Sequence, residues 1–255
     1  MQRAFLLASL LLLLLIIFSC AGEDKLEEDT TPPFPPTMIP HLGDVGDEPT
    51  DYYGQSTQIT DDNNGIDTIP EGDWIRIMWK PFVDDDVAIV RIWRFDDIQP
   101  EPVLIDSILP VTRQHLDTSN DLSERNWYSY FIEVADAAGN SAVSDTVSFA
   151  LLPKPVLLSP ASYETIPVVG ARAYWTDYGF ATKYRFLLFD SMHNYVWHHD
   201  LLVAMEDDLF VDIPTNLLSD HSGESMYWRV DAFDWDEERQ AYMGGKSNER
   251  ILIVQ

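Results

Sequence analysis

The chain has 255 residues, of which 16 are Lys or Arg and 43 are Asp or Glu, giving a formal charge of −27. Hydrophobic residues make up 45%, enough for the core of one large domain or two small ones. The acidic balance argues against nucleic acid as a partner, because a phosphate backbone is met by clustered Lys and Arg. The single cysteine excludes an intramolecular disulfide and a cysteine-based zinc site.

Residues 1–19 have the pattern of a targeting segment. Arg3 supplies a positive charge, and residues 4–18 form an apolar run that only Ser9 interrupts. As a helix this run would be about 22 Å long, which is shorter than the roughly 20 residues that a transmembrane helix needs. The length is typical of the hydrophobic region of a signal peptide.

The residues before Cys20 carry a family resemblance. Ile17, Ser19 and Cys20 resemble the bacterial lipoprotein signal, although Phe18 stands where a small residue is usual. The resemblance implies cleavage before Cys20, lipidation of Cys20 and stable anchoring of the chain to a membrane. It also implies a cell-envelope location, with the outer membrane favoured. The acidic stretch just after Cys20 resembles signals that send some lipoproteins to the outer face, so surface exposure is a hypothesis and a periplasmic face stays open. An ordinary cleaved signal and an uncleaved anchor remain as alternatives.

Residues 20–72 are predicted to form a disordered acidic tether. From Cys20 to Asp73 there are fourteen Asp and Glu and a single lysine, Lys25, together with seven prolines. Long apolar runs are absent, so this stretch cannot bury enough surface to offset the entropy of ordering it. We expect it to hold the folded part of the chain away from the membrane.

Residues 73–151 and 152–255 are predicted to form two domains of β-strands. Short runs of alternating apolar and polar residues are separated by turn signals such as Asp84–Asp86 and Gly139-Asn140. Leu152-Pro153-Lys154-Pro155 reads as a stiff linker, after which the strand pattern begins again. Candidate strands in the second half are residues 156–158, 171–176, 182–190, 195–199, 209–213, 225–233 and 249–254.

The two halves align with each other at a nearly constant spacing. Trp79 corresponds to Trp175, Ile92 to Phe186, and Asp136 to Asp234. A steady offset across three strands indicates a tandem duplication.

The first half resembles a fibronectin type III domain. Trp79 resembles the core Trp of the second strand, residues 90–94 resemble the third strand, and residues 128–141 resemble the sixth strand with its exit turn. The resemblance implies that Tyr128 is the tyrosine of the corner motif, with its hydroxyl bonded to nearby backbone. The second half is a looser match through Trp175 and residues 228–234, with Met226 in the place of the corner Tyr. We therefore expect an all-β chain of two tandem immunoglobulin-like β-sandwiches.

Acidic and histidine clusters are the candidates for metal sites. Residues 84–86 and 61–67 are oxygen-rich loops that could hold calcium, but we interpret both as solvated turns, and residues 61–67 fail the EF-hand pattern. His193, His198, His199 and Asp200 form the only histidine cluster of the sequence, yet adjacent residues on a strand point to opposite faces. We therefore assign no metal site, no cofactor and no catalytic residue. The sequence also lacks a Gly-x-Ser-x-Gly elbow and a phosphate-binding loop.

The tryptophans divide into two groups. Trp79, Trp93, Trp127, Trp175 and Trp228 lie on predicted strands and are expected to pack inside the sandwiches. Trp235 and Tyr242 instead flank a long acidic loop predicted at residues 235–245. Together with Asp234 and Asp236 they could bind a sugar ring, since flat aromatic faces stack on pyranoses. The alternative is that Trp235 and Tyr242 pack on each other and close the loop.

The sequence thus predicts a lipid-anchored envelope protein without enzymatic activity. Its expected role is to bind or scaffold another envelope protein, and exposed strand edges offer one mode of binding. The alternative function is capture of a surface glycan through Trp235, Tyr242, Asp234 and Asp236.

Overall fold

The computed structural model describes residues 29–40, 66–67, 74–176, 181–202 and 209–255. The chain divides into two compact units, Met1–Thr31 and Pro32–Gln255. In the first unit only residues 29–31 are described, and there the Thr31 N–H donates to Oδ1 of Asp29 at 3.0 Å. Cys20 and most of the predicted tether lie outside the described residues. No helix in the described part of the chain is long and apolar enough to span a membrane.

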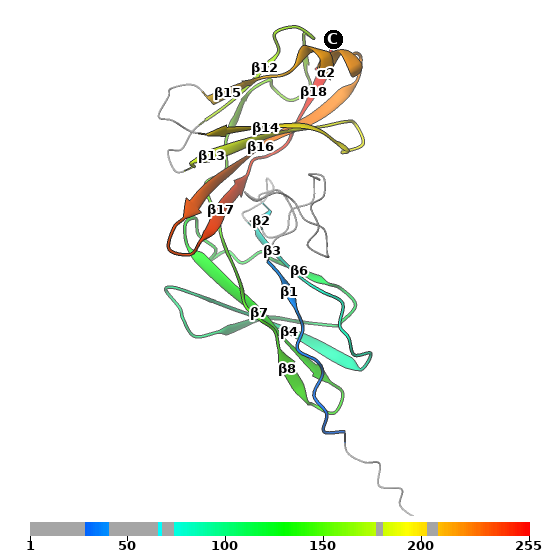
Figure 1. The fold of residues 1–255 in the computed structure, drawn as a ribbon, viewed down its shortest axis with the longest axis vertical. Helices are drawn as coiled ribbons and strands as arrows, with labels where there is room; N and C mark the ends of the chain where they lie inside the picture. Colours follow the sequence, from blue (N-terminus) through cyan, green and yellow to red (C-terminus); the bar gives the residue numbers. More distant parts are fainter. Residues whose placement is uncertain (1–28, 41–65, 68–73, 177–180, 203–208) are drawn as a thin grey trace, which may run out of the picture. The chain divides into compact units, whose positions relative to one another are not determined.

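The second unit is built from strands, which confirms the predicted all-β fold of two tandem β-sandwiches (Figure 1). One sheet of the first sandwich contains β1 (Met38–Ile39), β2 (Ile66–Asp67), β3 (Trp74–Trp79) and β6 (Gln114–Asp117). The other sheet has the order β5-β4-β7-β8, with β9 also paired to β7. Its strands are β4 (Val87–Asp96), β5 (Val103–Ile108), β7 (Trp127–Asp136), β8 (Ser141–Val143) and β9 (Val147–Ala150).

The second sandwich repeats this arrangement. Its smaller sheet has the order β10-β12-β15, formed by β10 (Leu157–Ser159), β12 (Arg172–Trp175) and β15 (Leu209–Asp212). Its larger sheet has the order β11-β18-β16-β13-β14, with β17 also paired to β16. The strands of this sheet are β11 (Glu164–Ile166), β13 (Lys183–Phe189), β14 (Tyr195–Leu202), β16 (Ser225–Asp236), β17 (Ala241–Lys246) and β18 (Arg250–Val254).

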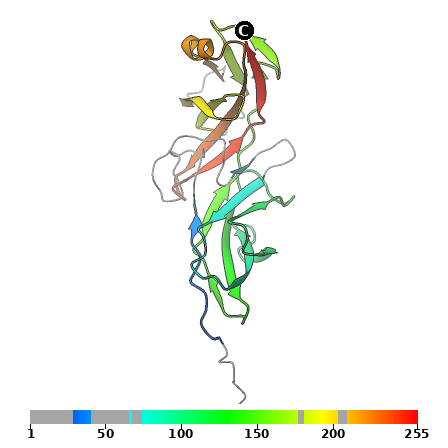
Figure 2. The same ribbon diagram turned by 90° about the vertical axis from the view of Figure 1, so that its right-hand side faces the viewer.

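A short helix, α2 (Thr215–Asp220), was not predicted. It lies at the end of the second sandwich where the chain terminates, as both views show (Figures 1 and 2). Its Leu218 is fully buried in the core of that sandwich. With six residues and one buried leucine, α2 is too short to give the helical periodicity that a sequence pattern requires.

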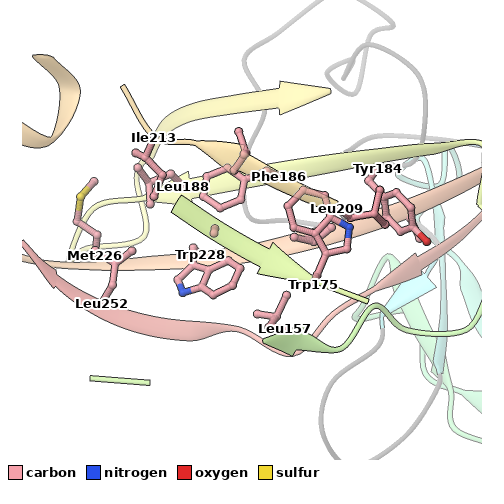
Figure 3. Packing of buried hydrophobic residues seen from close by; sticks show 14 of the residues in the cluster. Leu157, Trp175, Tyr184, Phe186, Leu188, Leu209, Ile213, Met226, Trp228 and Leu252 are labelled. Carbon is pink, nitrogen blue, oxygen red and sulfur yellow. The ribbon is translucent and has the colours of Figure 1, made fainter. Parts of the chain in front are cut away.

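Each sandwich closes around aromatic side chains that come from both of its sheets. In the second sandwich Trp175 and Tyr184 meet edge to face at 5.9 Å, and Phe186 stacks on Trp228 at 5.8 Å (Figure 3). Trp79 occupies the corresponding place in the first core, where it is buried on β3. The inward placement of these tryptophans matches the alternation of their strands.

The predicted tyrosine corner is present. The Tyr128 hydroxyl accepts the Ser123 N–H at 2.7 Å and donates to the Asp121 carbonyl at 3.2 Å. Met226 takes the equivalent place in the second sandwich and is fully buried. The second sandwich therefore fills this position with apolar volume instead of a hydrogen bond.

A buried ion pair joins the two sheets of the first sandwich. Arg94 on β4 donates to Oδ2 of Asp117 on β6 at 2.8 Å, and the hydroxyl of Tyr130 on β7 donates to the same oxygen at 3.0 Å. Oδ1 of Asp117 accepts the Ser119 N–H and hydroxyl. Burial alone would raise the pKa of Asp117, but the hydrogen bonds from Ser119 and Arg94 outweigh it and lower that pKa.

Part of the predicted tether belongs to the fold, so its boundary at residue 72 needs correction. Met38 and Ile39 form β1, pair with Trp79 and Met78, and are buried. The sequence pattern missed this strand because only two apolar residues, Met38 and Ile39, follow the proline-rich stretch, yet two are enough to pair with the edge of β3. Phe34 is also held, since its N–H donates to Oδ2 of Asp84 at 2.6 Å.

Candidate functional site

The four residues predicted to bind a ligand lie together on a hairpin. β16 and β17 pair so that Trp235 faces Tyr242, Asp234 faces Met243 and Asp236 faces Ala241. The expected long loop over residues 235–245 is therefore wrong: only residues 237–240 form the turn, with Gln240 at a φ of 52°. The pattern missed β17 because its two glycines and short apolar stretch do not alternate.

Trp235 and Tyr242 pack on each other, which agrees with the alternative to sugar binding given above. Their ring centroids lie 4.8 Å apart at an interplanar angle of 67°. Tyr242 also meets Phe233 edge to face at 6.2 Å, and the Lys183 ammonium lies 5.2 Å from the Tyr242 ring centroid. Both Trp235 and Tyr242 are half-buried. Their mutual contact uses aromatic surface that a sugar ring would otherwise cover.

Asp236 bonds to the first sandwich. Its Oδ2 accepts the indole N–H of Trp127 at 2.8 Å, while its Oδ1 accepts the backbone N–H groups of Glu238 and Arg239. The Arg239 backbone N–H is the main cause of the lowered pKa of Asp236, and the Trp127 bond adds to it. Asp234 lies 3.6 Å from the guanidinium of Arg125, which precedes β7.

The turn of the same hairpin makes a second contact with the first sandwich. Nη2 of Arg239 donates to both carboxylate oxygens of Asp97 at 2.5 and 2.6 Å, and the guanidinium lies 5.4 Å from the Trp127 ring centroid. Trp127 is 5% exposed and belongs to the core of the second sandwich, although it starts β7 of the first. Phe233 of β16 conversely joins the core of the first sandwich.

The chain between the two sandwiches is packed against β17. The Leu152 N–H donates to the Gly244 carbonyl at 2.8 Å, and a Cβ on Gly245 would lie 2.6 Å from the Leu152 carbonyl oxygen. Glycine at position 245 is therefore required by the close approach of two backbones. We call the set formed by Trp127, Leu152, Asp236, Arg239 and Gly245 the junction.

The turn aspartates explain part of the acidic composition. One carboxylate oxygen of each accepts two backbone N–H groups of the following turn, an arrangement that Asp side chains favour. The four residues are Asp96, Asp136, Asp190 and Asp236. Because Asp136 and Asp236 hold their turns in the same way, Asp236 is the structural equivalent of Asp136 in the second half. The alignment of the two halves by sequence had instead matched Asp136 with Asp234.

The predicted histidine cluster has no common centre. His193 bonds Glu249 at 3.0 Å, His198 bonds the Tyr195 hydroxyl at 2.7 Å, and His199 stacks against Trp197. The pairing of β13 with β14 also shifts register between Leu188 and Phe189, which interrupts the alternation of side chains along β14. Because of it, Trp197 packs with the main core of the second sandwich and Tyr195 with a small cluster of Leu187 and Phe189.

One tryptophan was assigned to the wrong face. Trp93 was expected inside the sandwich, yet Ile92 takes the core position on β4 and Trp93 faces outward. Its neighbours across the sheet are Leu104 on β5 and Phe131 on β7. Both parities of β4 carry apolar residues, so alternation alone could not choose the buried one.

A cavity of about 500 Å³ opens beside the ends of β1, β3 and β6. Apolar side chains of Ile39, Met78 and Val111 line it together with Arg113. None of the residues predicted to bind a ligand contributes to it.

Comparison with known proteins supplies no argument about the fold or the function of this chain. No family model and no curated protein matches the chain. A crystal structure of the FN1–FN3 domains of chicken CNTN1 aligns with 77% of this chain and 66% of its own length, at 11% identity and a TM-score of 0.33. The pectate lyase Pel3 of Pectobacterium carotovorum aligns with 40% of this chain and 30% of its own, at 16% identity and a TM-score of 0.26. Neither score reaches 0.5, so the sandwich assignment rests on the strand order and pairing.

Proposed function

We propose that this protein is a non-enzymatic binding or scaffolding module of the cell envelope, lipid-anchored at Cys20 and engaging another envelope protein. The observation that carries the proposal is the junction. At the junction, the core of each sandwich contains side chains from the other half of the chain. The hairpin of the second sandwich is also hydrogen-bonded to the first, through Asp236 to Trp127 and through Arg239 to Asp97. Such a joint suits a protein that presents two domains together.

The anchor is tested by removing the thiol. Cys20→Ser should move the chain from the membrane fraction to the soluble fraction and abolish incorporation of a labelled fatty acid, because the acyl chains supply the membrane affinity. A Cys20→Ser chain that remains in the membrane fraction would support the uncleaved-anchor alternative.

The exposed face is tested by protease treatment of intact cells, using an epitope inserted after Gln255. Loss of the epitope in intact cells would place the sandwiches outside and favour a surface partner. Protection until the outer barrier is broken would direct the search to periplasmic proteins.

The binding role is tested by photo-crosslinking from single surface positions on each sandwich in living cells. The proposal expects one protein to be captured from neighbouring positions and from few others. Uniform weak capture from all positions would argue against a specific partner.

Glycan capture through Trp235, Tyr242, Asp234 and Asp236 remains the alternative proposal, since Trp235 and Tyr242 keep part of their surface exposed. Trp235→Ala separates the two roles. Loss of polysaccharide binding at an unchanged Tm would support glycan capture. A stability loss of about 1 kcal/mol with no effect on binding would support the packing role that the edge-to-face contact favours.

A further inference from the structure

An apolar row crosses the outward face of the larger sheet in the first sandwich. The register places Leu104, Trp93 and Phe131 side by side on β5, β4 and β7. Trp93 and Phe131 are nearly parallel, with ring centroids 6.1 Å apart and planes 7° apart, and Phe95 lies 6.4 Å from Phe131. Outward positions of a solvated antiparallel sheet are usually polar, so this row marks a contact surface.

The row ends at an open strand edge. Among the described strands, β5 pairs with β4 alone. On β5 Val103 is 45% and Leu104 43% exposed, and Ile98, Leu109 and Val111 on the flanking segments are also exposed. An edge strand offers backbone N–H and C=O groups to another strand, and Lys or Pro residues commonly block such pairing. β5 has neither, and its one irregularity is the register shift opposite Ile92 and Trp93.

The charge around this edge selects the occupant. Residues 96–111 contain four acidic residues and no Lys or Arg. A second copy of a chain with charge −27 would be repelled here, whereas a basic segment would be attracted. A basic side chain of the chain itself already binds in the turn before β5, where Arg239 donates two hydrogen bonds to Asp97.

We propose that the β5 edge binds an extended basic segment of a partner protein as an added strand, with an apolar side chain of that segment continuing the Leu104–Trp93–Phe131 row. Backbone hydrogen bonds would supply affinity, and the alternation of apolar and basic residues would supply specificity. The register shift limits the pairing to a short segment. This inference rests on the proposed binding function and names its site and partner class.

The experiment uses the full chain and a synthetic peptide of about ten alternating Val and Lys residues, with a peptide of the same composition and contiguous valines as control. Affinities are measured by calorimetry for the wild type, Leu104→Glu and Leu202→Glu. Leu202 is an exposed leucine on β14, the edge strand of the second sandwich, so both variants add the same charge at a sheet edge. Amide hydrogen exchange along β5 is followed in the same samples.

The alternating peptide should bind more tightly than the control and slow amide exchange on β5. Leu104→Glu should weaken binding about tenfold although it adds a negative charge, and Leu202→Glu should leave binding unchanged. If the two variants weakened binding equally, or if the two peptides bound with equal affinity, charge attraction alone would explain the binding and the proposal would be overturned. Sedimentation that shows a dimer lost in Leu104→Glu would overturn it in favour of a second copy. If the crosslinking experiment captured one partner at a surface away from β5, the β5 proposal would be overturned while the proposed binding function would still hold.

Discussion

At the scale of single residues, the first sandwich depends on a few buried polar groups. Asp117 on β6 is 2% exposed and accepts hydrogen bonds from Arg94 and Tyr130, which belong to the opposite sheet, and from Ser119 in the turn after β6. A buried carboxylate is tolerated because these donors replace the water it loses. The same arrangement makes the sandwich sensitive to the protonation of a single group.

Acid should remove the contribution of Asp117. Its pKa is lowered in the folded chain, so its stabilisation is present above the unfolded pKa, near 3.8, and is lost as the pH falls through the lower folded pKa. Asp117→Asn should cost about 2 kcal/mol at pH 7, and the gap to wild type should narrow as the pH falls below about 4. Chemical unfolding of both proteins from pH 7 to pH 3 measures this gap; a gap that stays constant over this range would mean that folding does not lower the pKa of Asp117.

The tyrosine corner gives a second residue-scale prediction. Tyr128→Phe removes the acceptor of the Ser123 N–H and should lower the free energy of unfolding by about 1 kcal/mol. Tyr163→Phe is the matched control, because Tyr163 is exposed on the second sandwich and should show almost no change. Denaturant titration of the two variants compares them, and equal losses would argue against the corner bond.

At the scale of elements, the β16–β17 hairpin differs from the β13–β14 hairpin in what its turn contacts. The turn after β13 is held by Asp190 in the same way as Asp236 holds the turn after β16. Asp236 alone of this pair also accepts an indole N–H, that of Trp127 in the first sandwich. One carboxylate therefore fixes a local turn and the position of a second domain.

Replacing each of the two aspartates separates these effects. Asp190→Ala should loosen its own turn, and Asp236→Ala should additionally leave the buried Trp127 N–H without an acceptor, costing about 1–3 kcal/mol. Amide exchange should increase on both β7 and β17 in Asp236→Ala, and only around β13 and β14 in Asp190→Ala. An identical, purely local response in the two variants would show that the Trp127 bond does not couple the domains.

At the scale of the whole molecule, the two sandwiches should unfold together. Each core contains residues of the other half, and the Leu152–Gly244 bond closes the chain between them. Calorimetry should show a single transition whose van't Hoff and calorimetric enthalpies agree. Gly245→Val, which forces a side chain against the Leu152 carbonyl, should lower the Tm and resolve two transitions. Two transitions in the wild type would contradict this coupling.

Sequence patterns predicted most of these strands and failed where packing decides. Alternation located β3, β4, β7, β13 and β16, and the spacing of Trp79 and Trp175 revealed the repeat. It could not choose between Ile92 and Trp93 for the core, because both are apolar. β1 has only two residues, and β17 contains two glycines that serve the contact with Leu152. The role of Asp236 was also hidden, since its partner Trp127 lies 109 residues away.

The packed linker has a thermodynamic consequence for recognition. Two domains on a free hinge lose orientational freedom when one ligand touches both, and that loss weakens binding. Here Leu152 is bonded to Gly244 before any ligand arrives, so part of this freedom has already been given up during folding. A partner that spans both sandwiches would meet a partly preformed surface and would lose less orientational freedom on binding.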